Sequence, residues 1–160
     1  MKTYKTYYKS PLGLIIIVGT QDSILTLDFA EEMQPGDDDL PFCVKECVKQ
    51  IAEYFEGKRK EFFLNLDPHG TNFQKLVWRQ LEKIPFGQLV SYGDIARVIG
   101  NPNAGRAVGS ANGKNPIAII IPCHRVIGSD GSLTGYGGGL WRKEWLIAYE
   151  RGYSPDNIIA

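Results

Sequence analysis

The stretch of sequence that most constrains the fold covers residues 101–126 and reads NPNAGRAVGSANGKNPIAIIIPCHRV. Its first half predicts a helix that begins at Asn101-Pro102, because Asn caps helices well and Pro is tolerated at the first helical position. Four apolar residues recur at helical spacing and are expected to face the core, namely Ala104, Ala107, Val108 and Ala111. The opposite face carries one long cation, Arg106, among very small residues.

A second predicted helix precedes this one along the chain. Ser91 and Asp94 have the spacing of a capping box, and Gly100 is placed to end the helix. Two helices joined by a short turn, the second presenting a face of small residues, are typical of a DNA-binding helix-turn-helix. A surface helix packed closely on a neighbour would show the same glycines, so the pattern alone favours neither interpretation.

The second half of the stretch is strongly apolar. Residues 117–121 predict a fully buried strand that leads directly towards Cys123. Further along, residues 140–150 predict a last helix. Upstream, Thr71 and Gln74 have the spacing of another capping box, so a helix is expected to begin there as well.

The N-terminal part of the chain carries strand signals instead. Residues 7–13 resemble a strand entering a turn, and residues 14–18, 23–29 and 61–66 are predicted strands. Between the last two, apolar residues with a 3.6-residue period predict a helix from Pro41 to Gly57. The sequence therefore predicts a small sheet with one helix in this part.

Composition is that of an ordinary globular protein, and the zero net charge of the 160-residue chain points to no class of partner. The charge is unevenly distributed, however. Residues 1–72 hold 8 Lys/Arg against 12 Asp/Glu, whereas residues 73–160 hold 10 against 6. A positive half is a hint of a nucleic-acid-binding face, although chance segregation of surface charge would give the same imbalance.

The three cysteines are too few, and odd in number, for a secreted disulfide framework. With no apolar run of signal or membrane-span length, we expect a cytoplasmic protein with reduced thiols and no membrane contact. Cys43 and Cys47 lie one helical turn apart, which together with His69 would suggest a metal site. Because both cysteines fall on an apolar stripe, core packing is the favoured interpretation and no metal is predicted.

Cys123 and His124 are the candidate chemical pair. A cysteine is nucleophilic as the thiolate, its ordinary pKa is about 8.5, and a nearby imidazole can take its proton. Glu150, near the end of the last predicted helix, is a plausible carboxylate to orient that imidazole. Neighbours on a strand point to opposite faces, so cooperation would need a bend or a bridging water. A buried structural thiol and a Cys-His hydrolase remain alternatives at this level.

The hexapeptide Ile121-Pro122-Cys123-His124-Arg125-Val126 resembles the active-site signature of the methylated-DNA–protein-cysteine methyltransferases, or 6-O-alkylguanine-DNA alkyltransferases. The resemblance is strong over about residues 70–152 and reaches the N-terminal part only in outline. The other matching motifs stand in the family's order and spacing: Ser91-Tyr92, Arg106-Ala107-Val108-Gly109, Asn115-Pro116, Gly135-Tyr136, Gly138-Gly139-Leu140 and Lys143-Glu144-Trp145-Leu146.

This resemblance implies an α+β fold in two parts. Residues 1–68 would form a small ribonuclease-H-like domain of sheet plus helix. Residues 69–152 would form a winged-helix-like, helix-turn-helix domain that binds DNA and carries the active site, and residues 153–160 would be a tail. It also implies roles in catalysis: Cys123 accepts the alkyl group, His124 is a general base acting through a water, Glu150 orients His124, and Asn115 joins this network.

Further residues are implied to contact DNA or the damaged base. Tyr92 would crowd the phosphate 3′ to the lesion and donate to the flipped base, and Arg106 would enter the stack in its place. The carbonyls of Cys123 and Val126 would accept from the guanine amino group. The backbone N–H groups of Tyr136 and Gly137 would contact the guanine oxygen. The recognition helix adds the remaining contacts, which are those of Ala107, Gly109 and Ser110.

The implied function is direct-reversal repair. The alkyl group of 6-O-methylguanine, with 4-O-methylthymine as a further candidate, would pass irreversibly to Cys123 after base flipping, once per molecule. The partner would be the minor groove of double-stranded DNA, bound by a monomer without cofactor or metal. Arg125 could touch a phosphate or form a salt bridge to the last helix. A lesion-binding protein without transfer is one rival, but such proteins lack the acceptor cysteine and Cys123 is present. A plain winged-helix regulator is another, and it would not require Cys123, His124, Asn115 and Glu150 together.

Overall fold

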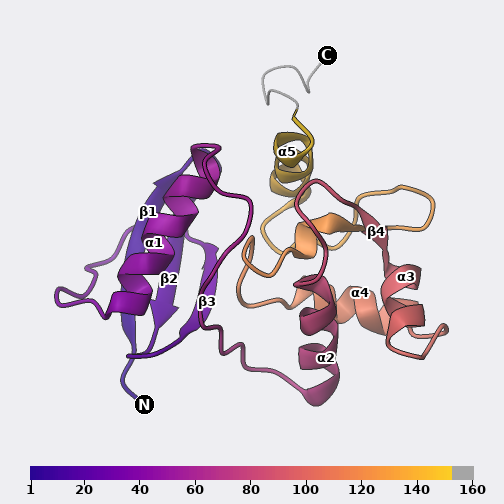
Figure 1. Cartoon of the computed structure of the whole chain (residues 1–160), viewed down its shortest axis with the longest axis horizontal. Helices are drawn as coiled ribbons and strands as arrows, with labels where there is room; N and C mark the ends of the chain where they lie inside the picture. The colour runs from indigo at the N-terminus through magenta and orange to yellow at the C-terminus, as the bar shows by residue number, and fades with distance from the viewer. Residues whose placement is uncertain (153–160) are drawn as a thin grey trace. The chain divides into compact units, whose positions relative to one another are not determined.

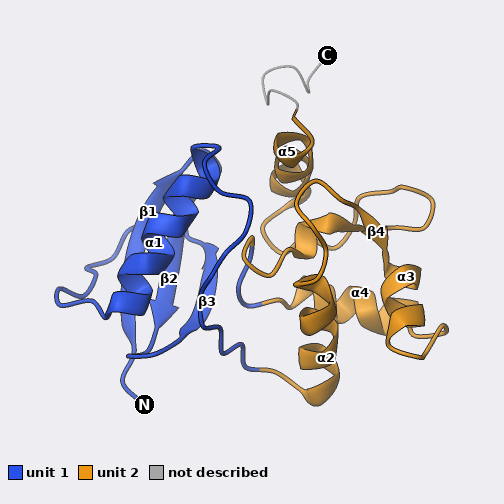
Figure 2. Cartoon of the chain, in the orientation of Figure 1, with its two compact units in different colours: residues 1–69, 116–118 blue, residues 70–115, 119–160 orange. Residues whose placement is uncertain are grey.

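The computed structural model describes residues 1–152, and the predicted tail at residues 153–160 lies outside them. The chain forms two compact units. Unit 1 consists of residues 1–69 and 116–118, and unit 2 consists of residues 70–115 and those from 119 onwards (Figure 2). Within residues 1–152, no helix is long and apolar enough to cross a membrane.

Unit 1 is a three-stranded antiparallel sheet in the order β1-β2-β3 with one helix packed on it. The strands are β1 (Tyr4–Ser10), β2 (Gly13–Gly19) and β3 (Ile24–Phe29), and the helix is α1 (Phe42–Phe55). Figure 1 shows α1 lying across one face of the sheet. The first strands and the helix after Pro41 are confirmed, and Gly57 follows the helix in the left-handed region, with φ 75°.

The core of unit 1 lies between the sheet and α1. Along β2, Ile15 and Ile17 are fully buried and alternate with half-buried residues, which is the period of a strand with one face on the core. Val44, Cys47 and Ile51 on α1 are fully buried at spacings of three and four residues, the period of a helix with one apolar face.

The predicted strand at residues 61–66 is wrong. Only Leu66 pairs, through an isolated bridge to Ile24. The reason lies in the buried Gln50 of α1, whose side-chain amide donates to the carbonyl of Phe63 (3.2 Å) and accepts from its N–H (2.9 Å). A side chain therefore satisfies backbone groups that a neighbouring strand would otherwise use.

Unit 2 contains the remaining elements: α2 (Asn72–Leu81), β4 (Val90–Ser91), α3 (Tyr92–Val98), α4 (Gly105–Gly113), the 3₁₀ turn η1 (Cys123–Arg125), β5 (Val126–Ile127) and α5 (Leu140–Glu150). β4 and β5 form a short parallel pair, and α4 packs against both α2 and α3. Both predicted capping boxes are present, at Thr71 with Gln74 and at Ser91 with Asp94. The last helix spans the predicted residues 140–150.

The helix of small residues begins later than predicted, at Gly105 rather than at Asn101-Pro102. The N–H of Asn101 instead bonds to the carbonyl of Ala96 and helps to close the end of α3, where Gly100 has φ 83°. The Asn101 carbonyl accepts from the N–H of Ala104, so the fixed φ of Pro102 serves a turn rather than a helix start.

The buried face of α4 also differs from the prediction. Val108 and Ala111 are buried, as expected, but Ala107 is exposed beside Arg106. The third buried residue is Asn112, one helical turn after Val108. The shift follows from the later start, because the helix packs on α2 and α3 through its second half.

Residues 117–121 are buried as predicted but do not form a strand. Only Ile117 pairs, through an isolated bridge to Leu27, and the chain then turns. Ile119 has φ 71°, a left-handed conformation that a β-branched residue rarely adopts and that a strand cannot contain. An apolar run fixes burial but not backbone conformation, and here the buried backbone turns towards Cys123.

Candidate active site

Two consecutive tight turns hold Cys123. Pro122 has φ −81° and ψ 65°, and the N–H of Cys123 donates to the carbonyl of Ile121 (2.8 Å), which is an inverse γ-turn. The 3₁₀ turn η1 follows, closed by the N–H of Arg125 donating to Pro122. All three residues of η1 are buried, with exposed fractions of 5% for Cys123, 0% for His124 and 6% for Arg125. The backbone therefore supplies the bend that a strand would lack.

His124 is hydrogen-bonded to the last residue of α5. Its Nε2 lies 2.7 Å from Oε2 of Glu150, and both side chains are almost completely buried. An ionised carboxylate only accepts, so Nε2 carries the proton and Nδ1 of a neutral ring keeps its lone pair. Nδ1 is buried and has no hydrogen-bond partner among the described residues. The ring is thus set up to accept a proton at Nδ1.

The charges around this pair favour a neutral imidazole beside an ionised carboxylate. Burial lowers the pKa of His124, and the cations Arg125 and Lys143 act in the same direction, against the opposing effect of Glu150. Burial would raise the pKa of Glu150, but its interactions with His124 and Arg125 hold that pKa well below the usual range for a carboxyl. A neutral His124 is the form that can act as a base.

Arg125 binds the same carboxylate. Its Nε donates to Oε1 of Glu150 (2.7 Å), its Nη2 donates to Oε2 (2.9 Å), and its Nη1 donates to the carbonyl of Ile84 (2.6 Å). Of the two roles left open from the sequence, the salt bridge to the last helix is the one present. The guanidinium is turned inward, and the residue as a whole is only 6% exposed.

Two asparagines brace the turn from the end of α4. Asn115 donates to the carbonyl of Ile121 (2.7 Å), and Asn112 donates to the carbonyl of Cys123 (3.2 Å). Asn112 is 1% exposed, and it was not predicted from the sequence as a site residue. The available signal was a polar residue four positions after Val108, on the buried face of the helix. The Cys123 carbonyl also accepts from the N–H of Val126, so both of its lone pairs are used.

Tyr92 and the fully buried Lys143 meet at the carbonyl of Thr134. The Tyr92 hydroxyl and the Lys143 ammonium each donate to that carbonyl at 2.8 Å, and Lys143 Nζ lies 3.3 Å from the Tyr92 hydroxyl. Lys143 ties α5 to the loop that follows β5, and the sequence does not predict a role for it. Its only sequence signal was its place inside a motif of the resemblance.

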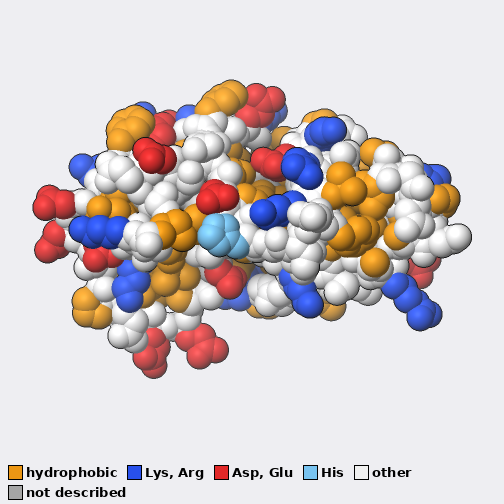
Figure 3. All heavy atoms as spheres, turned by 90° about the horizontal axis from the view of Figure 1, so that it is seen from below, with side chains coloured by type: hydrophobic (Ala, Val, Ile, Leu, Met, Phe, Trp, Pro, Cys, Tyr) orange, Lys and Arg blue, Asp and Glu red, His pale blue; other side chains and the backbone are white. Residues whose placement is uncertain are grey.

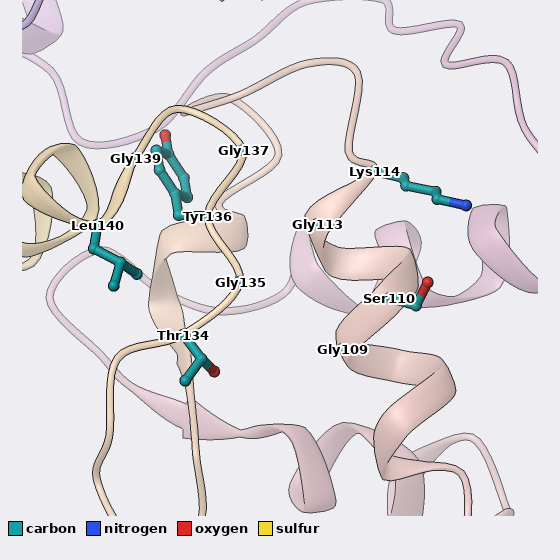
Figure 4. Close-up of a pocket in the computed structure, with 10 residues that line it drawn as sticks. All are labelled: Gly109, Ser110, Gly113, Lys114, Thr134, Gly135, Tyr136, Gly137, Gly139 and Leu140. Atoms are coloured by element: carbon teal, nitrogen blue, oxygen red, sulfur yellow. The ribbon is translucent and has the colours of Figure 1, made fainter.

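A hollow of about 760 Å³ lies between the C-terminal half of α4 and this loop (Figure 4). Four predicted contact residues line it: Gly109, Ser110, Tyr136 and Gly137. A Cβ added to Gly113 would lie 3.5 Å from the Gly135 carbonyl, and one added to Gly137 would lie 3.5 Å from the Gly113 carbonyl. Both are ordinary van der Waals distances, so the two backbones run close together at a spacing that would still admit a methyl group.

The other predicted residues lie outside the lining of this hollow. Cys123, His124 and Glu150 form the buried cluster described above, and the half-buried Asn115 lies beside it. Val126 is fully buried on β5, and Arg106 and Ala107 are exposed on α4. Charge is a weaker guide than this geometry, because acidic and basic side chains are interspersed on the face that Figure 3 shows.

Two family models match the chain in succession. Residues 3–68 match the ribonuclease-like domain of 6-O-methylguanine DNA methyltransferase, and residues 72–152 match the DNA-binding domain of the same family. A "Methylated-DNA--protein-cysteine methyltransferase" of Mycolicibacterium paratuberculosis is 46% identical over 99% of this chain and 98% of its own. One of the same name from Methanosarcina barkeri is 48% identical over 92% and 96%.

Solved structures agree. The O6-methylguanine methyltransferase of Mycobacterium tuberculosis superposes with a TM-score of 0.86 at 42% identity, covering 99% of this chain and 98% of that one. A structure of the M. tuberculosis protein in complex with DNA gives a TM-score of 0.83 at 45% identity, covering 93% of each chain. The predicted α+β fold class is confirmed. This chain belongs to the 6-O-methylguanine DNA methyltransferase family.

Proposed function

We propose that this protein repairs DNA by direct reversal, moving the alkyl group of 6-O-methylguanine onto its own Cys123. The observation that carries the proposal is the tight turn that holds the buried Cys123 and His124 in succession, with the His124 imidazole hydrogen-bonded to Glu150 at 2.7 Å. The names of relatives up to 48% identical support the same chemistry.

In the proposed reaction, Nδ1 of His124 takes the thiol proton through a water. The Cys123 sulfur then attacks the methyl carbon in line with the carbon–oxygen bond. The new S–C bond forms as the C–O bond breaks, and the bonding electron pair stays on the guanine oxygen. Guanine takes up a proton and is restored. Because no step breaks the thioether, each molecule acts once, and no cofactor or metal takes part. The same attack would serve 4-O-methylthymine.

Glu150 keeps His124 in the required tautomer and stabilises the cation that forms. Asn115 fixes the turn before Cys123 through its bond to Ile121. In-line attack requires the base to leave the stack, as base-directed enzymes generally do. Arg106, exposed on α4, fills the gap with its guanidinium plane, which recovers part of the lost stacking.

The flipped base is proposed to enter through the hollow beside α4 and to reach Cys123, which lies outside the lining of the hollow. The N–H groups of Tyr136 and Gly137 contact the oxygen of the base, and the carbonyl of Val126 accepts from its amino group. Tyr92 donates to the ring of the base once its hydroxyl gives up its bond to the Thr134 carbonyl. The Cys123 carbonyl can accept from the amino group of the base only if it loses one of its two present hydrogen bonds, from Asn112 or from the N–H of Val126. Three small residues of α4, namely Ala107, Gly109 and Ser110, let the helix approach the minor groove of double-stranded DNA.

The proposed division of labour assigns residues 1–68 to a supporting domain and residues 69–152 to DNA binding and catalysis. We further propose that one monomer, located in the cytoplasm, suffices for one lesion. These statements rest on the family and on the placement of every proposed active-site residue within unit 2.

Mass spectrometry of the protein mixed with excess DNA that contains 6-O-methylguanine tests the proposal. We expect one added methyl group per chain, mapped to Cys123, and no addition with unmethylated DNA of the same sequence. Binding without a mass change would indicate a lesion-binding protein. Turnover beyond one equivalent, or methyl on Cys43 or Cys47, would also contradict the proposal.

A further inference from the structure

Arg125 is the one buried cation of η1, and all three of its guanidinium nitrogens are engaged. Two of them form a fork on Glu150, at 2.7 and 2.9 Å, and the third donates to the carbonyl of Ile84 (2.6 Å). Such a bidentate arrangement fixes the plane of a carboxylate as well as its position. The proposed chemistry above assigns no task to this residue.

The fork and the imidazole share one carboxylate. Oε2 of Glu150 accepts from both His124 and Arg125, while Oε1 accepts from Arg125 and, at 3.4 Å, from the N–H of Gly87. Without the fork, the carboxylate would be free to rotate away from His124. Glu150 is also the last residue of α5, where the helix dipole disfavours a negative charge, so a cation is needed there.

The charges that bear on His124 come from two elements. Arg125 follows His124 on η1, which begins at Cys123, and α5 contributes Glu150 and Lys143. The buried residues of α2, which also packs on η1, are the apolar Val77, Trp78 and Leu81. A carboxylate alone would favour an imidazolium ring, which cannot accept a proton. A guanidinium on the same carboxylate offsets that preference.

We propose that Arg125 is a positioning residue for the transfer reaction, an inference that rests on the proposed function. Its fork holds the Glu150 carboxylate against His124 and balances its charge, so that His124 stays a neutral proton acceptor with the proton on Nε2. Arg125 donates to the Glu150 carboxylate and to the Ile84 carbonyl. It acts on the reaction through Glu150.

The chain offers a simple test, because it has only two histidines. His69 is exposed and serves as an internal reference in ¹⁵N NMR spectra, and the other signal is His124. In the unmodified protein at pH 7, we expect a neutral His124 with its proton on Nε2. An imidazolium, or a proton on Nδ1, would overturn the proposal without any variant.

Two variants separate charge from geometry. Arg125→Met removes both, so the midpoint for protonation of His124 should move to higher pH by about one unit or more. The acid limb of the pH–rate profile should move with it. Arg125→Lys keeps the charge but cannot form the fork. Its midpoint should change little, while single-turnover transfer slows by about 10-fold, part of the roughly 10²–10⁴-fold that general-base assistance contributes.

Arg59→Met is the matched control, because Arg59 also contacts a glutamate, Glu53, and a backbone carbonyl, but in unit 1. It should leave the His124 midpoint and the transfer rate unchanged. Removing one partner of a buried ion pair is strongly destabilising, so Arg125→Lys is the variant expected to fold in every case.

The proposal fails if folded Arg125→Met leaves the midpoint and the pH profile where they are in the unmodified protein. It also fails if Arg125→Lys transfers at the unmodified rate. If the unmodified protein transfers no methyl group at all, the proposed function fails instead, and the NMR midpoints still decide what Arg125 does to His124.

Discussion

Two buried cysteines, one in each unit, have very different surroundings. Cys47 of unit 1 is fully buried on the apolar face of α1, and burial, aided by the neighbouring Cys43, raises its pKa to about 12. Cys123 of unit 2 is nearly as buried, at 5% exposed, but its neighbours are His124, Arg125 and the amide of Asn112. Burial alone makes a thiol inert, and it is the buried polar network that makes one of the two a candidate nucleophile.

The glutamate–arginine pairs of the two units repeat the contrast. Arg59 and Glu53 meet in unit 1 with side-chain exposed fractions of 20% and 31%, whereas Arg125 and Glu150 are at 7% and 1%. A partly solvated pair contributes little to stability, about 0–1 kcal/mol. In the buried pair, every guanidinium nitrogen is hydrogen-bonded, so the orientation of the Glu150 carboxylate is fixed. His124 donates to the same carboxylate, and its orientation is therefore fixed as well.

The largest expected effect is the difference between replacing the two cysteines. Cys123→Ala should abolish methyl transfer from DNA, because it removes the acceptor atom. Cys47→Ala should retain full transfer per folded molecule and lower the free energy of unfolding by about 1–3 kcal/mol through lost core packing. Labelled-methyl transfer and urea unfolding measure the two. Residual transfer to Cys123→Ala would break the comparison.

A smaller effect is expected for Arg106→Ala, which tests base extrusion rather than chemistry. It should slow repair of duplex DNA by about 10- to 100-fold, equivalent to the roughly 1–3 kcal/mol that stacking on one base is worth. Reaction with free 6-O-benzylguanine should not change, because no base must be extruded. Lys45→Ala removes one exposed cation from unit 1 and should alter neither rate. Equal loss of both reactions would refute the assignment.

The smallest effect concerns the stability contributed by the inert thiol. Because the pKa of Cys47 is raised in the folded state from 9.0 to about 12, its contribution is complete below pH 9 and is lost as pH rises towards 12. At pH 10 the loss should be about 1.4 kcal/mol. Comparing unfolding of the unmodified protein and Cys47→Ala at pH 7 and pH 10 isolates this part. An identical alkaline loss in both proteins would contradict it.

Local signals along the sequence predicted much of this structure. The capping boxes at Thr71 and Ser91, the helix after Pro41 and the last helix at 140–150 depend on neighbouring residues, and all are present. Where the prediction was wrong, the backbone groups form hydrogen bonds with groups outside the predicted element. Gln50 satisfies Phe63 in place of a strand, and Asn101 closes α3 in place of starting α4.

The site divides in the same way. Cys123 and His124 are adjacent in the sequence, and the resemblance named Glu150, which the structure places 2.7 Å from the imidazole. Asn112 and Lys143 were missed because their roles depend on carbonyl groups that only the fold brings near them. Asn112 donates to the carbonyl of Cys123, and Lys143 donates to the carbonyl of Thr134. Arg125 could not be assigned from sequence, since the direction of its side chain depends on the turn that carries it.

The central claim is that the network around Cys123, rather than its accessibility, makes it react. The most direct measurement is the single-turnover rate of Glu150→Gln across pH, expressed per folded molecule and accompanied by a melting curve. We predict that transfer at pH 7 slows by about 10²–10⁴-fold and recovers as pH rises towards the ordinary thiol pKa of about 8.5. A lower melting temperature with an unchanged rate and pH dependence would show that Glu150 only stabilises the fold, and would contradict the claim.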